Sequence, residues 1–440
     1  MQEITNLIEQ NDVKNVALQF IDLSGILHSL WIPVEYFPDV AEKGTHTDGS
    51  SVGMLDVSKS DLKLKPDLST FVVLPPEIYP ERIARVVCDL YEPESDKPFE
   101  LCPRFVLKNA LEKVKETLGP SVMAYTASEI EFWLFNKGDN GEVTFIDDGA
   151  YLATPPKDRG LEFKLELVKH FRSMGVKIEK FHHEVPPGKS EFNIAYCPAL
   201  KMADTVYLVR MLLKIVADKQ GIIASFMPKP FHGEYGAGLH THISVVDDGK
   251  RKNLFDDPKG THGLSKTASH FLAGMLSHAK ALAGITNPSA NSYKRLVPGW
   301  EAPVYISWAR YNRSTLVRVP PGRGMATRFE YRPSDGTCNF YITYAAMLHA
   351  GLDGIRRKLE PPAPVEEDIY HMSERERADK GIETLPGSLG DALRVLSADT
   401  TLRDALGHAF FDKYLEIKLK EWKEYSTTVH PWERKRYLHI

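Results

Sequence analysis

The first hundred residues contain short, mainly apolar runs of the kind that form β-strands. Residues 15–22 (NVALQFID), 70–75 (TFVVLP) and 84–91 (ARVVCDLY) form such runs, and Pro, Gly and Asp separate them. The polar, proline-containing residues 92–103 have the composition of a linker. This pattern predicts a small, mostly β domain over residues 1–98 and a second, larger domain over residues 99–440.

Helical periodicity begins after this linker. Residues 104–119 (RFVLKNALEKVKETLG) place apolar side chains at helical spacing and stop at a glycine. Residues 203–221 place apolar side chains along one stripe and also end at a glycine, which predicts an amphipathic helix with a glycine cap. Residues 387–425 predict a helical region near the end of the chain. Strands and helices therefore both contribute to the fold.

Length and composition change this picture little. A chain of 440 residues exceeds the size at which one core stops growing, so two or more domains are expected. Charged residues make up 26% of the chain and hydrophobic residues 42%, and the net charge is -4. Because this balance gives no electrostatic reason to bind a polyanion, we expect no nucleic-acid partner.

Cysteine usage and the apolar runs bear on location. The four cysteines lie far apart and form no CxxC pair, so neither a zinc knuckle nor a redox motif is predicted. Residues 1–15 are acidic and amide-rich where a signal peptide would be basic and then apolar. No apolar run approaches the ~18 residues that a membrane span needs. We therefore expect a cytoplasmic protein without a membrane segment.

The first candidate chemistry is a pair of glutamates in residues 126–135 (TASEIEFWLF). Glu129 and Glu131 are two residues apart, and the period of a strand places both carboxylates on one face. Two carboxylates this close repel each other unless a cation lies between them. The pair therefore predicts either a metal site or a solvated strand face.

Two further segments repeat this arrangement. In residues 238–246 (GLHTHISVV), His240 and Ser244 share one strand face. In residues 327–333 (TRFEYRP), Glu330 shares its face with two arginines. Three strands with one charged face each predict a hollow lined with ligands for cations and anions.

Residues 181–194 (FHHEVPPGKSEFNI) add two carboxylates. Glu184 and Glu191 flank a stiff Pro-Pro-Gly turn, which can aim both at one cation. Together with the strand residues they supply enough oxygen ligands for two metal sites. Oxygen ligands with at most one imidazole favour Mg²⁺ or Mn²⁺ over zinc.

Arginines are concentrated in residues 291–320, which contain Arg295, Arg313 and Arg318, with Glu301 in a loop bracketed by Pro and Gly. Arginine forks bind carboxylate and phosphate through paired hydrogen bonds, so these residues suit a nucleotide and an acidic substrate. Surface salt bridges are the alternative. Neither GxxxxGK[ST] nor GxGxxG occurs, so any nucleotide is held by another type of fold.

Taken together, these segments resemble the glutamine synthetase family, specifically the shorter type I enzymes of bacteria and archaea. The resemblance runs from the DGSS loop at residues 48–51 to residues 428–438 (TVHPWERKRYL), and the motifs occur in family order. It implies an α+β fold with a small β-grasp-like N-terminal domain. The larger catalytic domain would have a curved antiparallel sheet flanked by helices.

The resemblance also implies roles for individual residues. One metal would be held by Glu131, Glu184 and Glu191, and the other by Glu129, His240 and Glu330. Glutamate would be bound by Arg295, Arg332 and Gly236, and the ATP phosphates by Arg313, Arg318 and Arg328, with Ser244 near the nucleotide. The ammonium pocket would use Asp48, Ser51, Tyr151 and the flap residue Glu301.

The implied activity is an ATP-dependent ligation of L-glutamate and ammonium, with two Mg²⁺ or Mn²⁺ ions per active site. ATP converts the γ-carboxylate into an acyl phosphate, because a free carboxylate is a poor electrophile. Asp48 would take a proton from ammonium, while Glu301 would serve as a lid that excludes water. Family members form two stacked hexameric rings, so a dodecamer is implied, in which Asp48 and Ser51 act across a subunit interface.

Two residues depart from the family pattern. Tyr235 stands where an asparagine is usual, and Lys189 stands where a glutamine is usual. These changes leave open a γ-glutamylamide ligase that uses an organic amine or another acid, although Asp48 suits a small cation better than a bulky amine. A catalytically silent regulatory paralogue is a third hypothesis, which the complete metal and arginine sets disfavour. Tyr370 matches a tyrosine that larger relatives modify with AMP, and we expect it to be a surface residue.

Overall fold

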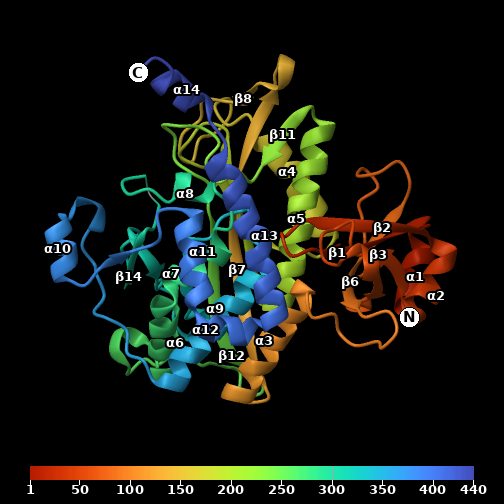
Figure 1. The fold of residues 1–440 in the computed structure, drawn as a ribbon. Coiled ribbons are helices and arrows are strands. Elements are labelled where there is room, and N and C mark those ends of the chain that lie inside the picture. Colours follow the sequence, from red (N-terminus) through yellow and green to blue (C-terminus); the bar gives the residue numbers. More distant parts are fainter. Residues whose placement is uncertain (301) are drawn as a thin grey trace.

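The computed structural model describes residues 1–300 and 302–440 and confirms the predicted α+β class. Two separate sheets organise the chain. Figure 1 shows the smaller sheet, which contains β1 to β6, to one side of a larger body built around β7. Within the described residues, no helix is long and apolar enough to cross a membrane.

The N-terminal sheet has the strand order β2-β1-β6-β4-β3, with β5 paired to β6. β1 and β6 run parallel to each other. Two of the three predicted runs are strands, but residues 70–75 contribute only the two-residue β5, because a 3-10 turn at Leu68–Thr70 precedes it. The strands are β1 (Asn15–Ile21), β2 (Leu27–Pro33), β3 (Thr45–Asp48), β4 (Asp61–Pro66), β5 (Val72–Val73) and β6 (Ile83–Tyr91), and the helices beside them are α1 (Gln2–Gln10) and α2 (Phe37–Lys43).

The larger sheet has the order β17-β14-β15-β16-β12-β7-β10-β9, with β8 and β11 paired to β7 and β13 paired to β12. Its neighbouring strands are antiparallel, except for the parallel pair of β14 and β15. Its strands are β7 (Val122–Lys137), β8 (Val143–Phe145), β9 (Ile178–His183), β10 (Lys189–Pro198), β11 (Ile222–Ser225), β12 (Leu239–Asp247), β13 (Lys252–Asn253), β14 (Tyr305–Ala309), β15 (Thr315–Arg318), β16 (Phe329–Tyr331) and β17 (Glu383–Thr384).

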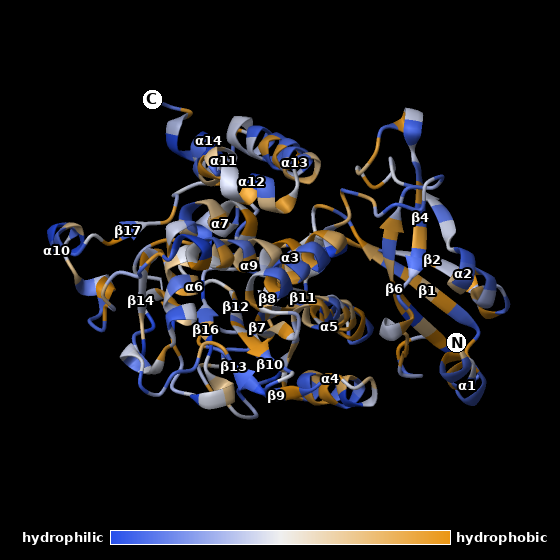
Figure 2. Cartoon of the chain, turned by 90° about the horizontal axis from the view of Figure 1, so that it is seen from below, coloured by the Kyte–Doolittle hydropathy of each residue, from blue (hydrophilic) through white to orange (hydrophobic). Residues whose placement is uncertain are grey.

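Helices cover this sheet, and the predicted ones are present. α3 (Pro103–Leu118) ends before Gly119, and α5 (Ala199–Lys219) ends two residues before Gly221, which has a φ of +71. Alternating hydrophobic and hydrophilic bands are visible along α3 and α13 (Figure 2). The other helices are α4 (Leu161–Ser173), α6 (Lys266–Ser277), α7 (Ala279–Thr286), α8 (Ser292–Arg295), α9 (Phe340–Arg357), α10 (Glu374–Asp379), α11 (Leu389–Ala398), α12 (Thr400–Leu406), α13 (His408–Thr427) and α14 (Pro431–Tyr437).

A buried arginine connects the N-terminal sheet to the larger body. Arg104 on α3 donates hydrogen bonds to Asp67 at 2.7 Å and to Asp89 at 2.8 Å. It also donates to both carboxylate oxygens of Asp204 on α5, at 3.0 and 2.9 Å. Because Arg104 is only 3% exposed, these charged hydrogen bonds are shielded from water and salt. The exact division at residue 98 stays a prediction.

Candidate active site

Strand register in the larger sheet brings the candidate ligands together. Glu129 on β7 lies opposite His240 on β12, and Glu131 on β7 lies opposite Glu191 on β10. Glu330 on β16 lies opposite His242, two residues after His240 on β12. Residues that pair across adjacent strands project from the same face of a sheet. Segments almost two hundred residues apart in the chain therefore supply one polar face.

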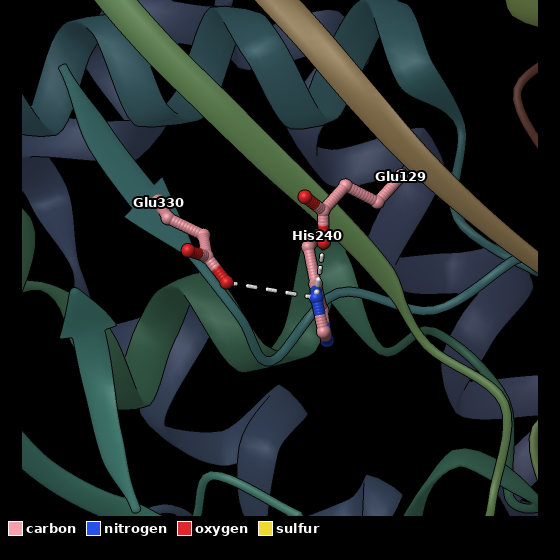
Figure 3. Close-up of side chains that lie close together, drawn as sticks. All are labelled: Glu129, His240 and Glu330. Carbon is pink, nitrogen blue, oxygen red and sulfur yellow. Dashed lines mark hydrogen bonds and ion pairs between the residues drawn. The ribbon is translucent and has the colours of Figure 1, made fainter. Parts of the chain in front are cut away.

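The first cluster consists of Glu129, His240 and Glu330, whose ligand atoms all lie within 4.8 Å of one another (Figure 3). Nδ1 of His240 is 3.0 Å from Oε2 of Glu129 and 3.6 Å from Oε1 of Glu330. Two carboxylates and one imidazole form a donor set that fits a divalent cation such as Mg²⁺ or Mn²⁺. This is the predicted second metal triad, and its assignment to a metal remains a proposal.

Neighbouring cations keep this cluster ionised. Burial disfavours the charged form of Glu129, but hydrogen bonds from His240 and His242 outweigh burial and hold its pKa far below the usual range. Glu330 is fully buried, and its two oxygens accept hydrogen bonds from Arg318 and Arg332. Burial opposes its ionisation too, but the arginine and histidine charges lower the pKa of Glu330 to about 2.

A second cluster consists of His182, Glu184 and Glu191. Nε2 of His182 is 3.0 Å from Oε1 of Glu184. Glu191 is 5% exposed, and its side chain has no hydrogen bond or ion pair within the described part of the chain. Its burial and the repulsion from three nearby carboxylates raise the pKa of Glu191 to about 9. A buried carboxylate in such surroundings is suited to a cation ligand.

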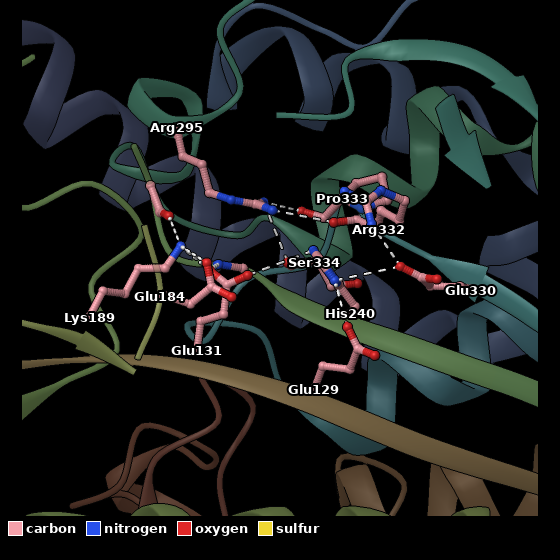
Figure 4. Close-up of polar contacts among 12 residues, drawn as sticks. Glu129, Glu131, Glu184, Lys189, His240, Arg295, Glu330, Arg332, Pro333 and Ser334 are labelled. Carbon is pink, nitrogen blue, oxygen red and sulfur yellow. Dashed lines mark hydrogen bonds and ion pairs between the residues drawn. The ribbon is translucent and has the colours of Figure 1, made fainter. Parts of the chain in front are cut away.

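Glu131, the third predicted ligand of this second metal, has a different partner in the structure. Its Oε2 lies 2.6 Å from Nζ of Lys189 and accepts a hydrogen bond from the backbone N–H of Gly238 at 2.8 Å (Figure 4). Burial opposes ionisation of Glu131, but Lys189 and His240 outweigh it and hold the pKa of Glu131 at about 2. His182 is thus the residue that lies close to Glu184 and Glu191, and the predicted ligand set of Glu131, Glu184 and Glu191 remains a proposal.

A cavity of about 760 Å³ opens beside both clusters. Glu129 also lines a smaller cavity of about 300 Å³. The larger cavity is lined by Tyr151, Gly236, Arg295, Arg313, Arg318 and Arg332 among the predicted site residues, and the smaller one by Ser244 and Arg328. The predicted substrate and nucleotide residues thus lie around two adjoining cavities.

Arg295 is one of the buried cations that line the larger cavity. Its guanidinium donates to the backbone carbonyls of Pro333 at 2.5 Å and Arg332 at 3.3 Å. Within the described residues no carboxylate lies within ion-pair distance of Arg295, so its charge is left for an anionic ligand. A Cβ atom at Gly236 would lie 2.5 Å from Cγ of Arg295, so only glycine permits this close approach.

Within the described chain, Asp48 and Ser51 of the predicted ammonium pocket lie apart from its third member, Tyr151. Asp48 is the last residue of β3 and Ser51 follows in the next turn, where Oγ of Ser51 donates to Asp48 at 2.6 Å; neither residue lines the cavity. Tyr151 does line it, half exposed, with its ring edge-on to His182. Glu301 lies outside the described residues.

The structure adds residues to which the sequence analysis assigned no role. His182 shares a face with Glu184 by the same period-of-two spacing that identified Glu129 and Glu131, so that signal was available. His242 lies 3.0 Å from Glu129. The expectation that Tyr370 is a surface residue is wrong, because Tyr370 is half-buried and lines the larger cavity.

Comparison with known protein families identifies the family of this chain. Residues 12–93 match the glutamine synthetase β-grasp domain, and residues 100–437 match the glutamine synthetase catalytic domain. The chain belongs to the glutamine synthetase family. Both the predicted family and the β-grasp fold of the N-terminal part are thereby confirmed. The chain is also an enzyme of this family's catalytic type, as predicted.

The similarity to individual relatives covers the whole length of this glutamine synthetase family member. The glutamine synthetase of Thermotoga maritima is 45% identical over 443 residues and is covered completely, as is this chain. That of Methanocaldococcus jannaschii is 42% identical, with 100% of this chain and 98% of the relative covered. Two solved structures of GmaS, one without ligand and one with ADP, superpose with a TM-score of 0.90 at 30% identity, and all of each chain is covered.

Proposed function

We propose that the protein is a glutamine synthetase, which uses ATP to join L-glutamate and ammonia into L-glutamine through γ-glutamyl phosphate. The observation that carries this proposal is the pair of acidic clusters on one sheet face, beside a cavity that contains Arg295, which has no ion pair within the described residues. Curated relatives named glutamine synthetase, at 40% to 45% identity, support it.

The donor sets fit two divalent cations per active site, Mg²⁺ or Mn²⁺. Glu129, His240 and Glu330 would hold one ion. Glu131, Glu184 and Glu191 would hold the other, with His182 beside Glu184 and Glu191. Such ions neutralise charge on the phosphates during phosphoryl transfer. Two carboxylates or more per cluster suit these hard cations.

The arginines would bind and orient the two anionic substrates. Arg295 and Arg332, with the backbone at Gly236, would hold the carboxylates of glutamate in the larger cavity. The phosphates of ATP would be held by Arg313, Arg318 and Arg328, and Ser244 would lie near the nucleotide. This places the γ-carboxylate and the terminal phosphate on the same side of the sheet, where alignment alone lowers the barrier.

Ammonium would be bound between subunits of a dodecamer of two hexameric rings. Hydrogen bonds from Ser51 and Ser50 lower the pKa of the exposed Asp48 to about 2, so Asp48 is anionic and attracts a small cation. Asp48 and Ser51 would reach the cavity of a neighbouring chain and meet Tyr151 and Glu301 there. Asp48 would accept the proton from ammonium, and Glu301 would close the site against water.

Phosphate release from ATP, measured with glutamate and Mg²⁺, tests this function. We expect strong turnover with ammonium, weak turnover with methylamine, and loss of turnover in Asp48→Ala. Asp56→Ala is the matched control, because Asp56 is also an exposed aspartate that accepts hydrogen bonds from a following serine. Turnover with methylamine alone, or full ammonium-dependent turnover in Asp48→Ala, would contradict the proposal.

The γ-glutamylamide ligase is the second candidate. Tyr235, whose ring lies edge-on to Trp300 at 5.8 Å, borders the larger cavity and supports it, as does the similarity to GmaS. The higher identity to relatives named glutamine synthetase favours ammonia over an organic amine. We also propose a cytoplasmic location, in which the four unpaired cysteines would stay reduced, and cell fractionation tests it.

A further inference from the structure

Arg85, in the N-terminal sheet, is a buried arginine whose side chain has no partner in the described chain. It lies within β6, where its backbone pairs with β1 on one side and with β5 on the other, so the sheet fixes its position. Arg85 is 3% exposed, and within residues 1–300 and 302–440 its guanidinium makes no hydrogen bond or ion pair. A guanidinium stays charged in proteins, and a buried charge is costly unless another group compensates it.

The acidic groups near Arg85 already have another partner. Both carboxylate oxygens of Asp204 accept hydrogen bonds from Arg104, which also donates to the two aspartates of the N-terminal part. Burial lowers the pKa of Arg85, and the attraction of Asp204 opposes burial without outweighing it. The positive charge of Arg85 is therefore left for a group from outside the chain.

A cavity of about 910 Å³ opens beside Arg85. Its walls come from both parts of the chain, because the segment around β5 and Arg85 form one side, and α3, α5 and the beginning of β7 form the other. Figure 2 shows α3 and α5 on the side of the larger body that is nearest to the N-terminal sheet. This junction cavity shares no lining residue with the two cavities of the candidate active site.

The walls of the junction cavity combine large apolar side chains with few unmatched charges. The apolar side chains include Phe71, Phe105, Leu111, Met123, Met174 and Leu208.

Two of the lysines that line the junction cavity are already paired, Lys108 with Asp89 and Lys115 with Glu112. Lys201 on α5 is exposed and has no ion pair within the described residues. The cavity thus offers one buried unmatched cation and one exposed unmatched cation beside apolar surface.

We propose that the junction cavity binds an organic monoanion, a carboxylate with an apolar body, whose charged end pairs with Arg85. An arginine fork binds a carboxylate through two parallel hydrogen bonds. One buried unmatched cation balances one negative charge, whereas a phosphate dianion would bring a second charge that only the exposed Lys201 could meet. The apolar walls bind the rest of the ligand by removing it from water.

This inference does not depend on the proposed function, because no residue of the junction cavity is assigned to ATP, glutamate, ammonium or a metal. The ligand would contact the N-terminal part and the larger body at the same time. It would therefore stabilise the junction between them, as any ligand does that binds only the folded state.

Calorimetric titration of the full-length protein with octanoate tests the proposal. 1-Octanol has the same chain length without the charge, and acetate has the same charge without the chain. We expect each of them to bind about tenfold or more weakly than octanoate, because a hydrogen bond to a charged group and the burial of several methylene groups each contribute at least such a factor. Saturating glutamate should leave octanoate binding unchanged. Displacement of octanoate by glutamate would place it at Arg295 and overturn the proposal.

Arg85→Met removes the charged fork and should weaken octanoate binding by about tenfold or more, while 1-octanol binding stays unchanged. Arg82→Met is the matched control, because Arg82 precedes the same strand, is half-buried, donates to the backbone carbonyl of Asn11 and does not line the cavity. Equal losses in the two variants would overturn the proposal. So would a wild-type protein that binds no octanoate, or that binds octanoate and 1-octanol equally, and this comparison needs no variant to fold.

Discussion

Replacing Arg104 with methionine removes four hydrogen bonds, two from α3 to Asp67 and Asp89 of the N-terminal part and two from α3 to Asp204 on α5. Each of the three aspartates then keeps another partner. Asp89 keeps Lys108, Asp204 keeps the hydroxyl of Tyr341, and Asp67 keeps Ser69. Breaking a buried ion pair from one side costs roughly 3–5 kcal/mol. Because partners remain, we expect Arg104→Met to lower the free energy of unfolding by about 3 kcal/mol, the lower end of that range.

Urea denaturation followed by tryptophan fluorescence measures this loss. The control is Arg375→Met, which removes an exposed arginine whose nearest carboxylate oxygen, on Asp379, is 4.0 Å away. Such surface pairs contribute little, so the control should unfold at the wild-type midpoint. Adding Asp204→Asn to Arg104→Met should restore part of the loss, because it removes one stranded charge. Equal midpoints for Arg104→Met and Arg375→Met would refute the view that Arg104 stabilises the junction.

Three further predictions concern the site and its surroundings. Glu129→Gln should weaken the binding of Mn²⁺ at the first cluster by about tenfold or more in a calorimetric titration, and an unchanged affinity would remove Glu129 from the ligands. Gly236→Ala should raise the KM for glutamate more than it lowers kcat, since its Cβ displaces Arg295; an unchanged KM would contradict this. Burial lowers the pKa of His349 in the folded protein from its ordinary value of 6.5 to about 4. Between these two pH values, His349 binds a proton in the unfolded chain but not in the folded protein. Stability is therefore present above pH 6.5 and decreases as the pH falls toward 4, by about 2 kcal/mol between pH 7.5 and pH 5. His349→Gln should flatten this dependence in urea unfolding at the two pH values, and an identical pH dependence in the variant would show that other groups cause it.

Which residues share a strand face could be predicted from local spacing. Glu129 and Glu131 are two residues apart, and so are Lys189 and Glu191, so the period of a strand alone places each pair on one side. The same reasoning, applied to the segment before the Pro-Pro-Gly turn, would have included His182. The helix ends near Gly119 and Gly221 could also be predicted from local sequence, because a glycine just after a helix favours its termination.

Which strands meet could not be derived from spacing. Glu129 faces His240 because β7 pairs with β12, and this register depends on contacts between segments more than a hundred residues apart. The resemblance to a family grouped Glu129 with His240 and identified Lys189 as a departure from the family pattern. It did not indicate what Lys189 contacts. Nothing in the sequence indicates that Lys189 reaches Glu131 and not the solvent, since a long side chain can point either way until the surrounding backbone is known. Residues 70–75 were predicted as a strand on apolar content alone, and the neighbouring turn shortens it.

Glu129 borders both cavities, and this shared wall has a thermodynamic consequence. A ligand in the smaller cavity that changes the energy of Glu129 also changes the affinity of the first cluster for its cation. Linkage is reciprocal, so the cation must change the affinity of the smaller cavity by the same factor. The order in which the two ligands arrive is then immaterial to the final population.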